Sequence, residues 1–190
     1  MVSLRPFVLA YAAAAGLASA APSISSLAKR PASFVSGTVN NTREFYVTMV
    51  VTEGTLLTKY DGQQIEAYHT GAGIADPVFK VAGTPAYLNN TQLQFDANAY
   101  PFSLVASAGD SNYARWEPTS IGISYGSTGF ANPGSKGIII NSTEFGGWLA
   151  CEWFHGANLP QLFQLIKGFN APDDVYPASC ARVKLVPKWI

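Results

Sequence analysis

Residue types that can do chemistry crowd one short stretch of the chain, FGGWLACEWFHGANLPQLFQL at positions 145–165. The stretch holds two of the four tryptophans, one of the two cysteines and one of the two histidines, and Glu152 directly follows Cys151. A carboxylate close to an imidazole can serve general acid–base catalysis or bind a metal ion. The stretch is therefore either a reaction site or a strand of the core.

A similar order of residues occurs earlier in the chain. Glu66 precedes His69 by three positions, as Glu152 precedes His155, and Gly-Ala follows closely in both places. A metal site with two histidines and one carboxylate would join these two segments. Residues three apart on a regular strand point to opposite faces, however. Each histidine is thus expected to bond backbone at a strand end, and the favoured interpretation includes no metal and no cofactor.

Strand alternation also sorts the side chains of the stretch. One face carries Leu149, Cys151, Trp153 and His155, and the other carries Trp148, Ala150, Glu152 and Phe154. Because both faces are largely apolar, we expect a central strand of a sandwich or the wall of a barrel. Glu152 then needs a partner, since an unpaired buried charge is costly. The cationic candidates for that role are Arg115 and Arg182.

Other catalytic patterns are weak or absent. A glycosidase would need a second carboxylate across a cleft from Glu152, and the spacing favours none of Asp96, Asp110 and Glu117. The chain has no G-x-S-x-G or H-E-x-x-H motif, and the segment HTGAGIADP lacks the lysine of a phosphate loop. That segment predicts a tight turn between strands. Six aromatic residues in or beside loops could stack on sugars, although aromatic residues on strands more often belong to the core: Tyr60, Tyr68, Tyr87, Tyr100, Tyr113 and Trp116.

Short runs rich in β-branched and aromatic residues, separated by Gly, Pro, Asn and Asp, continue after position 43. Residues 55–69 predict two strands that meet at an Asp61-Gly62 hairpin turn. The remaining predicted strands cover 44–52, 77–81, 86–95, 102–107, 120–126, 136–141, 148–155, 161–166 and 181–186. The fold class is therefore all-β, a single-domain antiparallel β-sandwich or β-barrel with helix limited to one or two turns.

The first residues predict export. Positions 1–20 combine Arg5, a short apolar run and an Ala-Ser-Ala end, the pattern of a secretory signal peptide. Residues 21–33 form an N-terminal segment with a candidate dibasic processing site at Lys29-Arg30, and residues 34–190 form the domain. No later stretch is long enough for a membrane span. We therefore predict a secreted protein, extracellular or in a cell wall.

Cysteine and asparagine usage agree with that compartment. An even number of cysteines in an exported chain favours a Cys151–Cys180 disulfide over a catalytic thiol. Sequons begin at Asn40, Asn89 and Asn141, which predicts N-glycosylation. Twelve basic and twelve acidic residues give a net charge near zero, so composition excludes an electrostatic nucleic-acid binder.

Three segments together resemble a known family: YHTGAGIADPVF at 68–79, FGGWLACEWFHG with the following PQLFQL, and CARVKLVPKWI at 180–190. The chain is similar to small secreted proteins of filamentous fungi with one β-rich domain and no established molecular function. Residues 157–159 lengthen the turn before Pro160, and Phe154 replaces an expected tryptophan. The resemblance implies the fold and the compartment and supplies no catalytic residues.

Two functional hypotheses follow. The first is a non-catalytic extracellular protein that binds a glycan, a lipid or a host protein at a cell wall or surface. The alternative is a secreted hydrolase or metal-dependent enzyme centred on Glu152, with His155 or His69.

Overall fold

The computed structural model describes residues 43–97, 102–106, 115–153, 157–167 and 175–190. The predicted signal peptide, the segment 21–33 and Asn40 lie outside these ranges, and so do Tyr100, Asp110, Tyr113 and His155. The described strands are β1 Phe45–Glu53, β2 Gln64–Gly71, β3 Ile74–Lys80, β4 Pro85–Asn89, β5 Gln92–Phe95, β6 Phe102–Ala106, β7 Trp116–Gly122, β8 Phe130–Ala131, β9 Ile139–Ile140, β10 Phe145–Trp153, β11 Leu159–Ile166 and β12 Cys180–Trp189. Two short 3₁₀ helices, η1 Thr58–Tyr60 and η2 Gly134–Lys136, complete the described elements.

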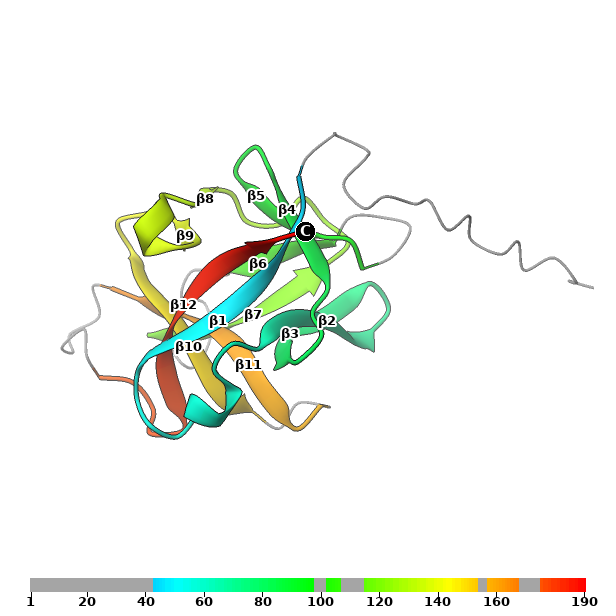
Figure 1. The fold of residues 1–190 in the computed structure, drawn as a ribbon. Helices are drawn as coiled ribbons and strands as arrows, with labels where there is room; N and C mark the ends of the chain where they lie inside the picture. Colours follow the sequence, from blue (N-terminus) through cyan, green and yellow to red (C-terminus); the bar gives the residue numbers. More distant parts are fainter. Residues whose placement is uncertain (1–42, 98–101, 107–114, 154–156, 168–174) are drawn as a thin grey trace, which may run out of the picture. The chain divides into compact units, whose positions relative to one another are not determined.

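The strands close into an antiparallel β-barrel. Nine of them form the ring, in the order β12-β1-β4-β5-β6-β7-β3-β11-β10 and back to β12. Strands β1 and β12, far apart in sequence, run side by side across the barrel (Figure 1). The ring closes where Phe45 and Tyr46 of β1 pair with Ala86 and Pro85 of β4. Of the two predicted architectures, the structure is the barrel, because this pairing removes the free sheet edges.

Alternating side chains fill the barrel interior. On β1, Phe45, Val47 and Met49 are at most 1% exposed, whereas the residues between them are not buried. Residues from other strands of the ring, including Leu104 of β6 and Leu162 of β11, join them in one hydrophobic cluster. Each such side chain contributes about 1.5–3 kcal/mol to the free energy of folding when it leaves water. The interior cluster therefore stabilises the ring as a whole.

Strand β10 is central, as its sequence predicted. It pairs with β11 along one edge and with β12 along the other. Trp148 and Ala150 belong to the interior cluster, whereas Leu149 and Cys151 belong to a second cluster on the outside of the wall. Cys151 lies opposite Cys180 of β12, and the two form the predicted disulfide.

Three strand predictions were wrong. Residues 55–60 do not form a strand, because Gly54 turns the chain at φ 92° and Leu57 inserts fully buried into the core, so that η1 replaces the hairpin. Residues 86–95 are two strands, since Asn90 adopts φ 54° and reverses the chain. The strand predicted at 120–126 is β7, which begins earlier because Pro118 fits in register opposite Phe163.

The segment predicted as a strand at 136–141 is only partly extended. Its first residue ends η2, and Ile139–Ile140 forms the short β9, which pairs with β8. Ile138 donates its backbone N–H to the carbonyl of Leu185 at 2.7 Å, so the β8–β9 ribbon is fixed to β12. No helix in the described ranges has the length and apolar character that crossing a membrane requires.

Removing the disulfide should destabilise the domain through the unfolded chain. The bridge joins residues 29 positions apart, and a loop of that size predicts a loss of roughly 3–4 kcal/mol in the free energy of unfolding. Urea unfolding of the double variant Cys151→Ala with Cys180→Ala measures this loss. A reducing agent should lower the stability of the unmodified protein equally and leave the double variant unchanged. Overlapping unfolding curves for the oxidised protein, the reduced protein and the double variant would contradict the prediction.

Two glycines of the η2 segment provide a matched pair. Both have positive φ, 72° for Gly134 and 70° for Gly137, but a Cβ on Gly134 meets no atom within 4 Å, whereas one on Gly137 overlaps the carbonyl oxygen of Leu185. Gly134→Ala should therefore lower the free energy of unfolding by about 1–2 kcal/mol, because its only penalty is that alanine must adopt the left-handed conformation. Gly137→Ala should cost about 2–5 kcal/mol, because steric overlap is added. Equal losses in denaturant unfolding would show that the close approach is unimportant.

Candidate functional site

Glu152 lies in an open pocket at the end of the β10–β11 pair. The pocket has a volume of about 240 Å³. Its lining combines a base, an acid, an amide, two aromatic rings and two aliphatic side chains: Lys59, Tyr60, Glu152, Trp153, Asn158, Leu159 and Pro160. We refer to this recess as the Glu152 pocket. It is small enough to hold one sugar-sized group and open enough for a chain to continue out of it.

Two separate parts of the chain build the pocket. The η1 turn supplies Lys59 and Tyr60, and it is held at the barrel end because Leu57 is buried and Asp61 accepts a hydrogen bond from the backbone N–H of Val51 at 2.8 Å. The other wall is the end of β10 and the start of β11. There Asn158, exposed and at φ 53°, immediately precedes the first residue of β11.

The charged partner of Glu152 is Lys59. Their Nζ and Oε1 atoms are 3.7 Å apart, and 62% of the lysine side chain and 34% of the glutamate side chain are exposed. The prediction that Arg115 or Arg182 fills this role was wrong. Arg182 pairs with Glu53 at 3.3 Å, and Arg115 donates its Nε–H to the carbonyl of Val175 at 3.0 Å. The Glu152 carboxylate does not lose its hydration on folding, because it lies at the end of β10, where solvent reaches it.

Two half-exposed rings border these charges. Trp153 packs edge-on against Phe163, with ring centroids 5.5 Å apart at 70°, which fixes its plane. Tyr60 packs against the interior cluster, and the ammonium of Lys59 lies 4.9 Å from its ring centroid. Ring surfaces held in place beside polar groups suit a ligand with apolar and polar faces.

The other predicted sugar-stacking residues lie elsewhere. Tyr87 is buried, and this burial, with smaller contributions from Asp96 and Glu44, raises the pKa of its hydroxyl above the usual value. Trp116 packs against the outer cluster around the disulfide. Tyr68 lies below the ammonium of Lys80 on the β2–β3 hairpin. Among the predicted aromatic residues in the described ranges, Tyr60 alone lines the Glu152 pocket.

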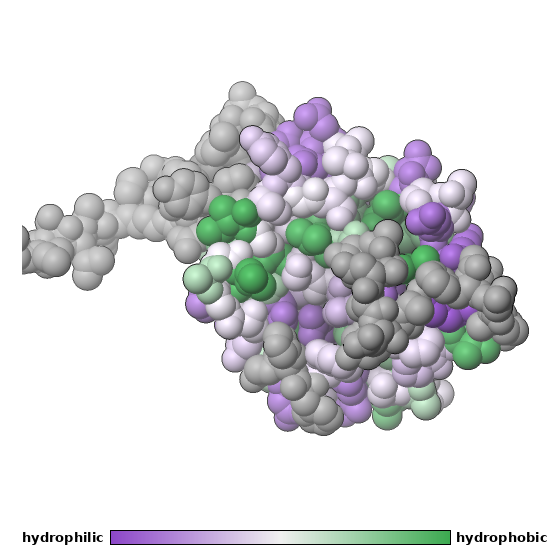
Figure 2. Space-filling view, turned by 180° about the vertical axis from the view of Figure 1, so that it is seen from behind, coloured by the Kyte–Doolittle hydropathy of each residue, from purple (hydrophilic) through white to green (hydrophobic). Residues whose placement is uncertain are grey.

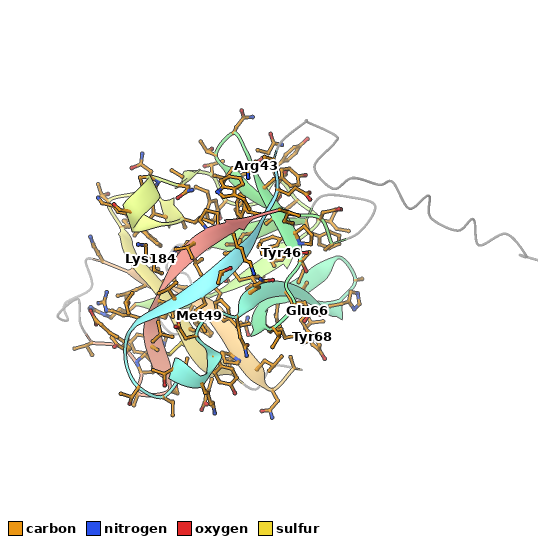
Figure 3. The ribbon with its side chains drawn as sticks, in the orientation of Figure 1. Arg43, Tyr46, Met49, Glu66, Tyr68 and Lys184 are labelled. Atoms are coloured by element: carbon orange, nitrogen blue, oxygen red, sulfur yellow. A yellow bond between two sulfur atoms is a disulfide. The ribbon has the colours of Figure 1, made fainter. Side chains whose placement is uncertain are left out.

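Glu66 and His69 do not join Glu152. Glu66 lies on β2 beside Tyr68 (Figure 3) and forms an ion pair with Lys80. Its neighbour in register on β3 pairs with β11, which in turn pairs with β10, so two strands and about 14 Å separate Glu66 from Glu152. His69 is exposed near the tip of the hairpin.

The described residues contain no group of three or more His, Cys, Asp and Glu side chains that could hold a metal ion. Of the candidates for a second carboxylate, Glu117 is 1% exposed on the barrel wall, and Asp96 lies beside Tyr87. Neither lines the Glu152 pocket. In the described part of the site, the charged and amide groups that line the pocket with Glu152 are therefore those of Lys59 and Asn158.

Sequence reasoning identified Glu152 and Tyr60 and missed the rest of the pocket. Lys59 was hidden in a segment predicted to be a strand, and Trp153 was assigned to a core face. Asn158 could have been recognised as a turn residue. It lies directly before Leu159-Pro160, and asparagine is favoured where the chain turns with positive φ, as it does here.

The chain matches the family described as Domain of unknown function (DUF7907) over residues 42–189. The protein therefore belongs to this family. No curated protein and no solved structure matches the chain.

The Lys59–Glu152 pair should contribute little to stability. Because both side chains are solvated, Glu152→Gln and Lys59→Met should each change the free energy of unfolding by less than about 1 kcal/mol. Leu57→Ala, in the same loop but fully buried, should cost about 2–5 kcal/mol. Denaturant unfolding of the three variants tests this contrast. A loss at Glu152 as large as that at Leu57 would assign the glutamate a structural role.

Proposed function

We propose that this protein is a secreted, N-glycosylated extracellular protein that binds carbohydrate of a cell wall or surface in the Glu152 pocket, without catalysing a reaction. The observation that carries the proposal is the composition of that pocket. It places two ring surfaces, Tyr60 and Trp153, beside a carboxylate, an ammonium and an amide. A sugar ring has a C–H face that packs on aromatic rings and hydroxyls that bond to charged and amide groups.

Export and a fungal source enter the proposal from the sequence. The first twenty residues have the pattern of a signal peptide, and the resemblance at 68–79, 145–165 and 180–190 is to secreted proteins of filamentous fungi. A disulfide between Cys151 and Cys180 fits an oxidising compartment. These features support a place outside the cell, where wall polysaccharides are abundant ligands.

A carbohydrate suits the protein better than the other two partners predicted from the sequence. On the face drawn in Figure 2, the described residues present hydrophobic groups separated by hydrophilic ones. A large continuous exposed apolar patch is the feature that marks a site for a lipid surface or an apolar protein partner. The Glu152 pocket instead offers a small recess in which polar groups surround two rings.

The test is binding of neutral oligosaccharides, first on an array of wall glycans and then by calorimetry with the best ligand. Glu152→Gln should weaken binding about 10-fold, because it replaces a charged acceptor, worth about 1.5 kcal/mol or more to a sugar hydroxyl, with a neutral one. Asn158→Gly should weaken binding about 2- to 10-fold, because it removes a neutral hydrogen bond of about 0.5–1.5 kcal/mol. Glycine tolerates the positive φ of Asn158, so the backbone is preserved.

Tyr125→Ser is the matched control. Tyr125 is 84% exposed and does not line the pocket, so its replacement should leave affinity unchanged. The proposal fails if no glycan binds, or if the pocket variants bind the glycan as tightly as the unchanged protein.

The alternative is a hydrolase in which Glu152 is the catalytic carboxylate; His69, on the β2–β3 hairpin, is separated from it by two strands, and His155 lies outside the described residues. The open position of Glu152 supports it, because a catalytic carboxylate must be accessible to substrate. Incubation with the bound glycan separates the two proposals. An enzyme would release shorter products, and Glu152→Gln would abolish their release while the glycan still bound.

A further inference from the structure

A second recess lies at the other end of the β10–β11 pair. It has a volume of about 190 Å³, and its lining includes Ile140, Ser142, Glu144, Phe145 and Gln164. We call it the Gln164 recess. Ile140 ends β9, Phe145 begins β10, and Ser142 and Glu144 lie on the turn between them. Ser142, the middle residue of the sequon Asn141-Ser142-Thr143, therefore lines this recess, and Asn141 lies between two lining residues in the chain.

Asn141 is exposed on a turn with a well-bonded backbone. Its N–H donates to the carbonyl of Gly129 at 2.7 Å, and the N–H of Ser142 donates to the carbonyl of Ile140 at 2.9 Å. The hydroxyl of Ser142 accepts a hydrogen bond from the N–H of Glu144 at 3.2 Å. These hydrogen bonds hold the backbone of the sequon in place, and the Asn141 side chain is exposed at the surface.

The side chain of Asn89, the other sequon asparagine in the described ranges, forms a hydrogen bond within the fold. Its Nδ2 donates to Oε1 of Gln94 at 3.1 Å, and Nε2 of Gln94 donates to Oγ of Ser103 at 3.1 Å. Gln94 is 4% exposed and Ser103 is fully buried. A sugar on Asn89 would be attached to the nitrogen that begins this relay, which would keep one N–H, and its ring would have to fit beside the buried Gln94. The relay therefore opposes modification at this sequon.

We propose that Asn141, and not Asn89, carries an N-linked glycan whose first sugar rests in the Gln164 recess. This inference relies on the proposed secretion and does not depend on the Glu152 pocket. In the transfer, Nδ2 of Asn141 attacks C1 of a sugar held on a lipid pyrophosphate. The C1–O bond to the pyrophosphate breaks as the N–C1 bond forms. The amide nitrogen loses one proton to a base of the transferase, and the lipid pyrophosphate leaves.

The chemistry of the recess suits a sugar attached at its rim. Phe145 and Ile140 are half-buried and offer apolar surface to the C–H face of the ring. Glu144 and Ser142 are exposed beside them and can bond to hydroxyl and acetamido groups. The attached sugar would cover side chains that are otherwise partly wetted, so it should stabilise the fold.

Glycopeptide mapping of protein secreted by a eukaryotic host tests the choice of asparagine. All variants carry Thr42→Ala, so that only the two described sequons remain. Thr143→Ala should remove the remaining glycan, whereas Thr91→Ala should leave it in place; both changes keep the asparagine itself. A glycan on Asn89, or secreted protein with an unmodified Asn141, would overturn the proposal.

Melting temperatures test whether the sugar rests in the recess. Trimming the glycan to its first sugar should leave the melting temperature unchanged, whereas Thr143→Ala should lower it by roughly 2–4 °C in secreted protein. The same substitution should have no effect in protein made in bacteria, where the sugar is absent. If the secreted Thr143→Ala variant has the same melting temperature as the glycosylated protein, the sugar does not rest in the recess. Oligosaccharide binding by the Glu152 pocket is measured separately and is not expected to change.

Discussion

The burial of β10 on both faces is the constraint on which the rest of the structure depends. Trp148 and Ala150 fill the interior, while Leu149 and Cys151 are covered on the outside. A strand covered on both faces can exist only if elements from distant parts of the chain surround it. The pairing with β11 and β12, the disulfide to Cys180 and the outer cluster are the consequences of that requirement.

The same constraint explains why both recesses are found at the ends of β10. Along its middle the strand has no room for a polar group, so polar side chains occur where the covering layers stop. Glu152 lies at one such end and pairs with Lys59 in solvent, and Glu144 precedes the strand at the other. The barrel wall is a rigid support, and the turns at its ends carry the groups available for binding.

Sequence predicted those features that depend on local pattern or on simple pairing. Alternation placed Trp148 and Leu149 on opposite faces, and two cysteines in a chain predicted to be exported implied their bridge. Sequence reasoning failed where a distant contact outweighed local preference. The sequence of residues 55–60 predicts a strand, but Leu57 is buried in the core, and the residues after it form η1. The partner of Glu152 could not be found for the same reason, because Lys59 reaches it only after η1 forms.

The separation of the two recesses indicates how the protein would be oriented against a wall polysaccharide under the proposed extracellular function. From Phe145 to Glu152 the strand advances seven residues, about 24 Å at the usual rise. A glycan on Asn141 would therefore occupy one end of the barrel and leave the Glu152 pocket open at the other. Bulk and solvation at the glycosylated end would disfavour contact with a wall on that side. The opposite end, with Tyr60 and Trp153 beside exposed polar groups, would then be the side that faces the polysaccharide.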